Sequence, residues 1–371
     1  MKGAVAALLL GVIVALGIGE VALRLYNPIE LRLRGTRIVL PTNTSSVLHL
    51  EQARKLESPI RVSRNSLGFR GREPPRPFDA ALSILAIGGS TTECRLLSDE
   101  HTWPAVLERR LAARVPRLWL NNAGLDGHST YGHLMLLQQV VAPLRPRYAL
   151  FLIGVNDVGR DDLNDFDRAM LLERRGVGDR VVAASELLST AQVLLRSLRA
   201  AREDRGHKWE LDLARAARRR RGIPPDVEET LLREHGAGAV PAYARRVEAL
   251  ILASRAAGIE PMLITQPALW GDETDPATGI PLGTIASGQW NAAVRWRLLE
   301  LYNATTRRAG GEHGVLVIDL ATALSKDSRL FYDWVHFTRD GARRVADVIQ
   351  GELLPFLVRR GDVQAERPAA P

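Results

Sequence analysis

The sequence predicts an α/β fold in which a parallel sheet carries helices on both faces. Five short, apolar, β-branched segments alternate with segments of helical spacing, as expected for strands joined by helical crossovers. Strands are expected at residues 82–88, 118–122, 148–154, 261–266 and 315–320. Helices are expected at residues 103–115, 131–141, 243–257, 289–308 and 342–358. Polar motifs follow several strands, and ligands of open α/β sheets bind at that carboxyl edge.

The composition is that of an ordinary globular protein. The chain has 371 residues, of which 46% are hydrophobic and 25% charged, enough for two domains or one large α/β domain with insertions. The formal net charge of +8 permits binding to nucleic acid, anionic lipid or acidic polysaccharide without choosing among them. A single cysteine, Cys94, excludes an internal disulfide framework.

The first segment is long and apolar enough to cross a bilayer. Residues 3–19 carry no charge, and about 20 helical residues span about 30 Å of hydrocarbon. We expect residues 1–26 to form an uncleaved membrane anchor, with a cleaved signal peptide as the alternative, because only Lys2 supplies a basic n-region. The positive residues that follow, such as Arg24, would by count keep the carboxyl side cytoplasmic, which leaves the orientation open.

Three further segments lie outside the alternating pattern. Residues 27–80 are polar and interrupted by prolines, which is typical of a linker and N-terminal extension. We expect this segment to become ordered near residues 65–71. A helical insertion is expected at about residues 160–240, with amphipathic segments at 186–201 and 211–221. The second segment ends in four arginines, for which a solvated face is favoured over a surface for anionic headgroups or acidic glycans. Nucleic acid is not an expected partner, because no aromatic residues alternate with these arginines.

Four motifs carry the residue types of one reaction. They are residues 88–91 (GGST), 121–130 (NNAGLDGHST), 154–157 (GVND) and 333–338 (DWVHFT). The Ser90 hydroxyl becomes a nucleophile only when an imidazole accepts its proton, a role that His336 can take. Asp333, three residues before that histidine, can set its tautomer and stabilise the imidazolium. The backbone N–H of Ser90, that of Gly127 and the Asn156 side-chain amide can supply an oxyanion hole.

Together these blocks resemble the SGNH (GDSL-type) hydrolase superfamily across residues 82–358. The resemblance implies a flavodoxin-like three-layer α/β/α fold and a hydrolase domain at residues 81–360. Residues 361–371 are expected to form a disordered tail. It assigns Ser90 as the nucleophile, with Gly127 and Asn156 in the oxyanion hole. His336 is then the general base and Asp333 its partner. The family's usual aspartate before the serine is replaced here by Gly89, a variant that some branches carry.

The predicted function is hydrolysis of carboxylic esters through an acyl-enzyme. The anchor and several motifs also resemble a membrane-anchored bacterial branch that often accompanies polysaccharide synthesis, which implies an acylated glycan or small molecule as substrate and a periplasmic catalytic domain. Two alternatives stay open, an O-acyltransferase that uses the same residues and a catalytically idle glycan-binding module. An α/β-hydrolase is rejected, because Thr92 stands where its Gly-x-Ser-x-Gly elbow needs glycine.

The remaining reactive residue types are assigned structural roles. His128 and His133 are expected on a loop and a helix surface, and Cys94 is expected to pack rather than react. Asp157 is expected to brace its own loop through the backbone. Three tryptophans (Trp270, Trp290 and Trp296) are expected in the core, with the lining of an apolar or sugar-stacking cleft as the alternative. No metal or cofactor is expected, because no cluster has metal-ligand spacing and no segment resembles a phosphate-binding loop. The sequence does not indicate an oligomeric state.

Overall fold

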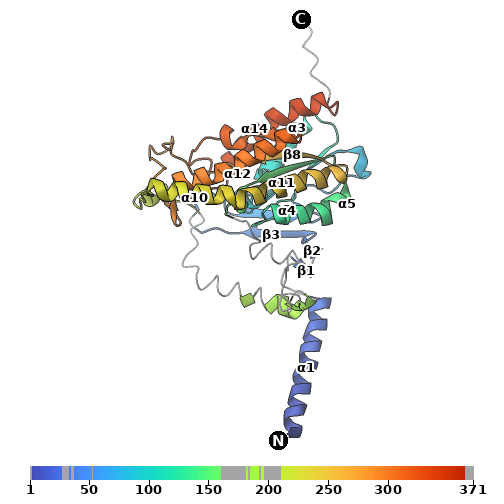
Figure 1. Ribbon diagram of the computed structural model, residues 1–371. Helices are drawn as coiled ribbons and strands as arrows, with labels where there is room; N and C mark the ends of the chain where they lie inside the picture. Colours follow the sequence, from blue (N-terminus) through green and yellow to red (C-terminus); the bar gives the residue numbers. More distant parts are fainter. Residues whose placement is uncertain are drawn as a thin grey trace. The chain divides into compact units, whose positions relative to one another are not determined.

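The computed structural model describes residues 2–26, 33–34, 37–51, 53–159, 181–182, 184–191, 194–195 and 210–363. The chain forms two compact units (Figure 1). One comprises Met1–Pro41 and Asn164–His207, and the other comprises Thr42–Leu163 and Lys208–Pro371. The expected disordered tail, except for residues 361–363, lies outside the described residues.

The larger unit is built on the predicted sheet. Its five parallel strands run in the order β11-β8-β7-β5-β6. They are β5 (Leu82–Gly88), β6 (Leu118–Asn122), β7 (Tyr148–Ile153), β8 (Glu260–Thr265) and β11 (Val317–Ile318). Every residue of β7 is buried, as expected for a central parallel strand covered on both faces. The first two strands match their predicted bounds, whereas β11 is shorter than expected.

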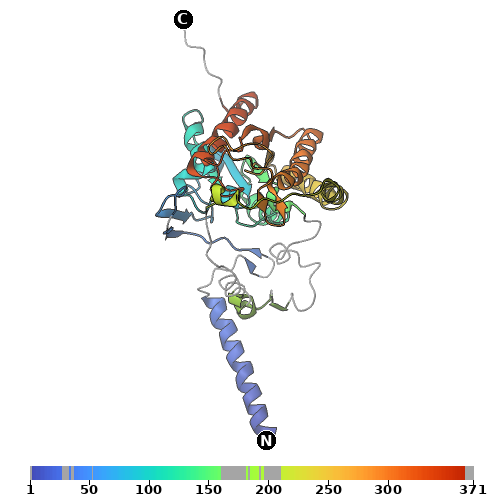
Figure 2. The same cartoon turned by 90° about the vertical axis from the view of Figure 1, so that its left-hand side faces the viewer.

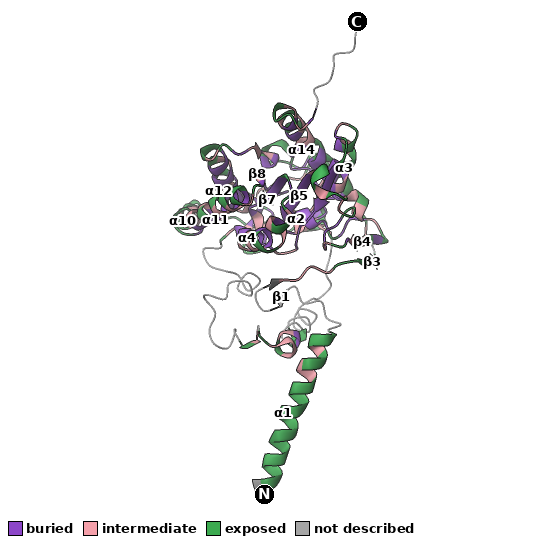
Figure 3. Cartoon of the chain, turned by 90° about the vertical axis from the view of Figure 1, so that its right-hand side faces the viewer, coloured by how far each residue is buried: buried purple, intermediate pink, exposed green. Residues whose placement is uncertain are grey.

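Helices cover both faces of this sheet, which confirms the three-layer α/β/α fold. The principal helices are α3 (Trp103–Ala112), α4 (Thr130–Leu136), α11 (Ala239–Ala256), α12 (Ala292–Glu312) and α14 (Arg339–Arg359). Figure 3 shows α3 and α14 on one side of the buried strands, with α4, α11 and α12 on the other. Figure 2 gives the perpendicular view of the same layers. Because all five strands are parallel, their carboxyl ends lie at the same edge of the sheet.

Shorter elements complete the larger unit. They are β3 (Thr44–Leu48), β4 (Ile60–Arg64), α2 (Ser90–Glu93), α5 (Ala142–Leu144), α9 (Leu213–Ala216), α10 (Pro225–Ala237), β9 (Ala286–Ser287), β10 (Trp290–Asn291) and α13 (Leu320–Ala323). The helix expected at residues 131–141 ends instead in a π-helical turn at Leu137–Val141. The antiparallel β3–β4 pair shows that order in the extension begins before residues 65–71.

The four-arginine run ends the segment that the sequence assigned to the insertion. Its side chains are exposed, yet Arg220 donates to the Thr284 hydroxyl at 2.6 Å and Arg221 donates to the Gln289 carbonyl at 2.7 Å. These contacts tie the run to the loop at residues 281–289, so it is more than a solvated face. Of the amphipathic stretch expected at 186–201, only residues 186–191 and 194–195 are described, and both pieces are helical.

The smaller unit contains the apolar helix α1 (Lys2–Leu25) and two short strands, β1 (Leu33–Arg34) and β2 (Arg37–Ile38). Residues Gly3–Leu25 of α1 are long and apolar enough to cross a membrane, with a mean hydropathy of 2.4. This helix could be a membrane anchor or a signal sequence, because both have this length and composition.

Candidate active site

The first motif meets the last one at the carboxyl edge of the sheet. Ser90 is the first residue of α2 and follows β5 after one residue, Gly89. The Oγ atom of Ser90 lies 2.7 Å from His336 Nε2, although 246 positions separate the two residues in the sequence. The other ring nitrogen, Nδ1, lies 2.6 Å from Asp333 Oδ2. The structure thus brings together the three residues that the sequence singled out for proton transfer.

The loop before α14 fixes the orientation of the imidazole. Asp333 Oδ1 accepts hydrogen bonds from the backbone N–H groups of Val335 and His336, each at 2.8 Å. The Tyr332 ring stacks on the His336 ring, with centroids 5.4 Å apart and planes 8° apart. A carboxylate held by its own turn and a ring held by stacking leave the imidazole little freedom to rotate.

The electrostatics of the pair favour an ionised aspartate and a basic histidine. Burial acts to raise the pKa of Asp333, but the hydrogen bond and charge of His336 outweigh burial, so the pKa is lowered. Burial acts to lower the pKa of His336, but the Asp333 hydrogen bond and charge outweigh it, so this pKa is raised above 6.5. The imidazole can therefore accept a proton and hold it next to a negative charge.

The three candidate oxyanion donors come from three neighbouring segments. The backbone N–H of Ser90 opens α2, where the first amides have no acceptor within the helix. Gly127 has φ +76° with open space where a side chain would begin, so substrate can approach its N–H closely. Asn156 follows β7, and its side-chain Nδ2 donates to the His128 carbonyl at 2.9 Å. That bond uses one of the two amide hydrogens and leaves the second for a ligand.

Gly89 lies in close contact with this amide. A Cβ atom built on Gly89 would stand 2.3 Å from Asn156 Nδ2 and 3.2 Å from the His128 carbonyl oxygen. A side chain at position 89 would therefore displace Asn156. The glycine that replaces the family's aspartate is thus required by the packing of the Asn156 side chain in this chain.

Glu93 joins the serine-bearing helix to the loop that carries Gly127. This buried carboxylate accepts a hydrogen bond from the backbone N–H of Asp126 at 2.7 Å and another from Arg64 Nη2 at 2.6 Å. The backbone N–H of Leu125 also donates to the Gly88 carbonyl at 3.0 Å. Hydrogen bonds before α2 (at Gly88) and at its end (at Glu93) therefore hold the Gly127 loop against the helix that bears Ser90.

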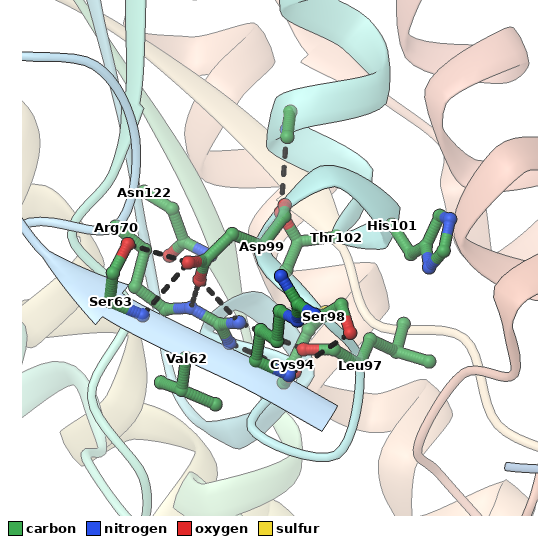
Figure 4. Close-up of polar contacts among 12 residues, drawn as sticks. Val62, Ser63, Arg70, Cys94, Leu97, Ser98, Asp99, His101, Thr102 and Asn122 are labelled. Carbon is green, nitrogen blue, oxygen red and sulfur yellow. Dashed lines mark hydrogen bonds and ion pairs between the residues drawn. The ribbon is translucent and has the colours of Figure 1, made fainter. Parts of the chain in front are cut away.

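Arg70, from the N-terminal extension, holds the far end of the same helix (Figure 4). Its side chain is 3% exposed, and its guanidinium donates to the carbonyls of Glu93, Cys94 and Leu97 at 2.6, 3.0 and 2.8 Å. It also donates to Asp99 Oδ1 at 2.8 Å, while the other oxygen of that carboxylate accepts from Ser63. The carbonyls that end α2 therefore have donors from outside the helix.

Asp157 has a different partner set from the one that the sequence predicted. Its buried carboxylate accepts from the backbone N–H and hydroxyl of Thr130, at 3.1 and 2.6 Å. Arg246 of α11 forms an ion pair with it at 3.1 Å. The prediction that Asp157 braces its own loop is therefore wrong, since it ties the loop after β7 to the start of α4 and to α11.

Two histidines predicted on surfaces are buried. His128 and His133 are 1% and 2% exposed, and burial lowers the pKa of His133 to about 3. Gly132 explains part of the error, because a Cβ atom there would lie 2.5 Å from His128 Nδ1. The ring therefore packs against bare backbone. Cys94 packs as expected, and burial raises the pKa of its thiol to about 12.

The three tryptophans predicted in the core are partly exposed. Trp296 lines a cavity of about 550 Å³ together with Lys326 and Glu273. The Lys326 amine donates to the Ala268 carbonyl at 3.0 Å, and burial lowers its pKa to about 7. Among the described residues, no group of three or more histidine, cysteine, aspartate or glutamate side chains could hold a metal ion.

Three residues that contribute to the site were not predicted from the sequence, namely Arg64, Arg70 and Glu93. Glu93 could have been found, because it lies three residues after Ser90 and so one helical turn away. Both arginines act across long sequence separations, from a segment whose composition resembles a linker. No local signal in the sequence distinguishes them from solvated arginines.

The five-stranded parallel sheet with helices on both faces and a polar site at its carboxyl edge defines this protein as a three-layer α/β/α protein. The chain belongs to the GDSL-like lipase/acylhydrolase family, which matches residues 86–344. This membership confirms the predicted superfamily and makes the chain an ester hydrolase. No curated protein matches it.

Several solved structures are similar to the chain at low sequence identity. An alpha/beta hydrolase enzyme from the metagenome of Lake Arreo is 19% identical, with a TM-score of 0.41, over 73% of this chain and 95% of that one. An acetylxylan esterase from Geobacillus stearothermophilus is 16% identical, with a TM-score of 0.42, over 74% and 94%. A lipase/acylhydrolase from Enterococcus faecalis is 16% identical, with a TM-score of 0.41, over 77% and 100%.

Proposed function

We propose that this ester hydrolase is a serine esterase that forms an acyl-enzyme on Ser90. The observation that carries the proposal is the pair of short contacts from His336, 2.7 Å to Ser90 Oγ and 2.6 Å to Asp333 Oδ2. In the first step the serine oxygen bonds to the ester carbonyl carbon as His336 Nε2 takes its proton. The imidazolium then returns this proton to the departing alcohol. Asp333 stays ionised throughout.

The proposed oxyanion hole consists of the backbone N–H groups of Ser90 and Gly127 and the side-chain amide of Asn156. Each donor would act on the charge that develops on the carbonyl oxygen during attack. Loss of one such donor costs about 2.7–4 kcal/mol of transition-state stabilisation in serine hydrolases. The Glu93 contact with the Asp126 N–H supports this role, because it holds the Gly127 loop against the serine-bearing helix.

In the second step water replaces the alcohol. His336 takes a proton from the water as its oxygen bonds to the acyl carbon, and then gives that proton to Ser90 Oγ as the acyl–serine bond breaks. The products are a carboxylic acid and the regenerated serine. We propose an acylated glycan or small molecule as substrate, and α1 as a membrane anchor for an extracytoplasmic hydrolase; both rest on the sequence resemblance stated above.

The test is the reaction of the full chain with p-nitrophenyl acetate and with a fluorophosphonate probe. Ser90→Ala should abolish both hydrolysis and labelling while the melting temperature stays that of the wild type. Ser46→Ala, which removes an exposed serine from β3, is the matched control and should change neither. Hydrolysis or labelling that survives in Ser90→Ala would refute the assignment.

A further inference from the structure

The apolar helix α1 contains one acidic residue, and that residue has a full set of partners. Glu20 Oε1 accepts hydrogen bonds from Arg24 Nε at 2.7 Å and from the backbone N–H of Glu186 at 3.0 Å. Its Oε2 accepts from the Ser185 hydroxyl at 2.7 Å and from the backbone N–H of Leu187 at 3.0 Å. A carboxylate so close to hydrocarbon is costly unless it is paired, and these four donors pair it.

Other contacts hold the same two segments together. Arg24 Nη2 donates to the Ala184 carbonyl at 2.8 Å. A Cβ atom on Gly19 would lie 2.8 Å from Leu187 Cδ1, so this leucine packs on the bare backbone of α1. Figure 1 shows the short green helical pieces of residues 181–195 beside the carboxyl-terminal end of α1. The contact therefore combines ionic, hydrogen-bonded and apolar parts.

The same segment also has uncovered apolar side chains. Val181, Leu188, Leu194 and Leu195 are 53%, 38%, 47% and 56% exposed. Leu187 is turned toward α1, whereas the adjacent Leu188 is exposed. The apolar side chains of α1 are exposed in the same way, from Val5 to Leu25. In a helix beginning at Gly3, Glu20 lies about 26 Å along the axis, near the end of a hydrocarbon layer about 30 Å thick.

We propose that the described residues of this segment (181–182, 184–191 and 194–195) form a second membrane contact. Their exposed apolar side chains enter the lipid interface, and Glu20 binds the segment to the end of the anchor helix. We infer a lipid bilayer as the partner of this surface, because the segment binds the one described helix that is long and apolar enough to cross a bilayer. It binds this helix at the depth of the interface between lipid and water. This inference rests on the proposed anchoring by α1. It also implies that α1 is retained, since cleavage would remove the carboxylate that binds Ser185.

The test measures lipid contact at single positions of the full chain in phosphatidylcholine–phosphatidylglycerol vesicles. An environment-sensitive fluorophore is attached at Leu188→Cys or Leu195→Cys, and its quenching by lipids with nitroxides at shallow or deep positions is recorded. Ile13→Cys, at the middle of α1, reports the anchor itself. Val227→Cys, which is 39% exposed on α10, is the control for an apolar position outside the segment. The native Cys94 is buried and stays unlabelled.

We expect shallow nitroxides to quench positions 188 and 195, deep nitroxides to quench position 13, and neither to quench position 227. Adding Glu20→Ala should abolish quenching at 188 and leave position 13 quenched. Quenching at 13 without quenching at 188 would overturn the second contact and leave the anchor intact. Absence of quenching at 13 would overturn both, whereas undiminished quenching at 188 in Glu20→Ala, or equal quenching at 227, would overturn the inference alone.

Discussion

Replacing Arg70 with alanine should destabilise the hydrolase unit by several kcal/mol. The buried guanidinium supplies donors to three main-chain carbonyls, those of Glu93, Cys94 and Leu97, and to the Asp99 carboxylate. Removing one partner of a buried charged network costs about 3–5 kcal/mol. The variant loses all four of these hydrogen bonds, although the Cys94 carbonyl keeps the Leu97 N–H and the Asp99 carboxylate keeps Ser63. At about 2–4 °C per kcal/mol, the melting temperature should fall by roughly 10 °C. Because the Glu93 and Cys94 carbonyls lie at the end of α2, kcat should fall more than KM rises.

The measurement is urea and thermal unfolding of the detergent-solubilised full chain, followed by near-ultraviolet circular dichroism. Arg61→Ala is the matched control, because this exposed arginine lies in β4 (Ile60–Arg64) of the same extension. It is a surface residue, so its loss should cost less than about 1 kcal/mol. If Arg70→Ala lowers stability no more than Arg61→Ala does, the extension does not hold the serine-bearing helix.

Three predictions concern the chemistry of the site. Because Asp333 raises the pKa of His336, kcat/KM should fall on acidification with a midpoint above pH 6.5. The Asp333→Asn variant should have a lower midpoint and a lower kcat. A midpoint that does not move in the pH profile of this variant would refute the coupling between the two residues. Gly127→Ala should cost about 1–2 kcal/mol of unfolding free energy, measured in urea, because φ is +76° there. Gly89→Asp should lower kcat on p-nitrophenyl acetate about 10²-fold by displacing Asn156, and wild-type kcat would contradict the packing argument.

The sheet was predictable because each of its strands is a short run of apolar residues with polar or turn-forming residues at both ends. The bounds of β5 and β6 follow from the sequence alone, and the helices between the strands appear within a few residues of their expected positions. The helix α10 lies in the expected helical insertion and begins at Pro225. Proline suits the first turn of a helix, where its missing N–H has no acceptor.

The order in residues 42–64 was not predictable, because it depends on partners far along the chain. The Glu210 carboxylate accepts hydrogen bonds from the backbone N–H groups of Arg54, Lys55 and Leu56. Asp99 accepts from the backbone N–H of Ser63 at 2.8 Å. A short polar segment whose hydrogen bonds all go to distant partners has the composition of a linker, and its order cannot be predicted locally.

The residues that would carry the reaction were predictable from the sequence, whereas the residues that hold them in place were not. Ser90, Asp333 and His336 carry local motifs that specify a reaction, whereas the Arg64–Glu93 ion pair joins residues with no motif. The buried His128 shows the same limit, since a glycine-rich loop looks exposed until Gly132 brings the backbone against the ring. Local patterns report chemistry and strand ends, and they do not report long-range contacts between polar groups.

The position of Arg70 has a consequence for how this enzyme could recombine in evolution or in the laboratory. The family match begins at residue 86, yet Arg70 contacts the helix that bears Ser90, and Asn65 donates to the Asn121 side chain at 2.9 Å. A domain exchange made at the family boundary would separate the serine from the arginine that secures its helix. The structural unit that must be exchanged as a whole is therefore longer than the segment matched by the family. It begins with the strand pair at Thr44–Leu48 and Ile60–Arg64.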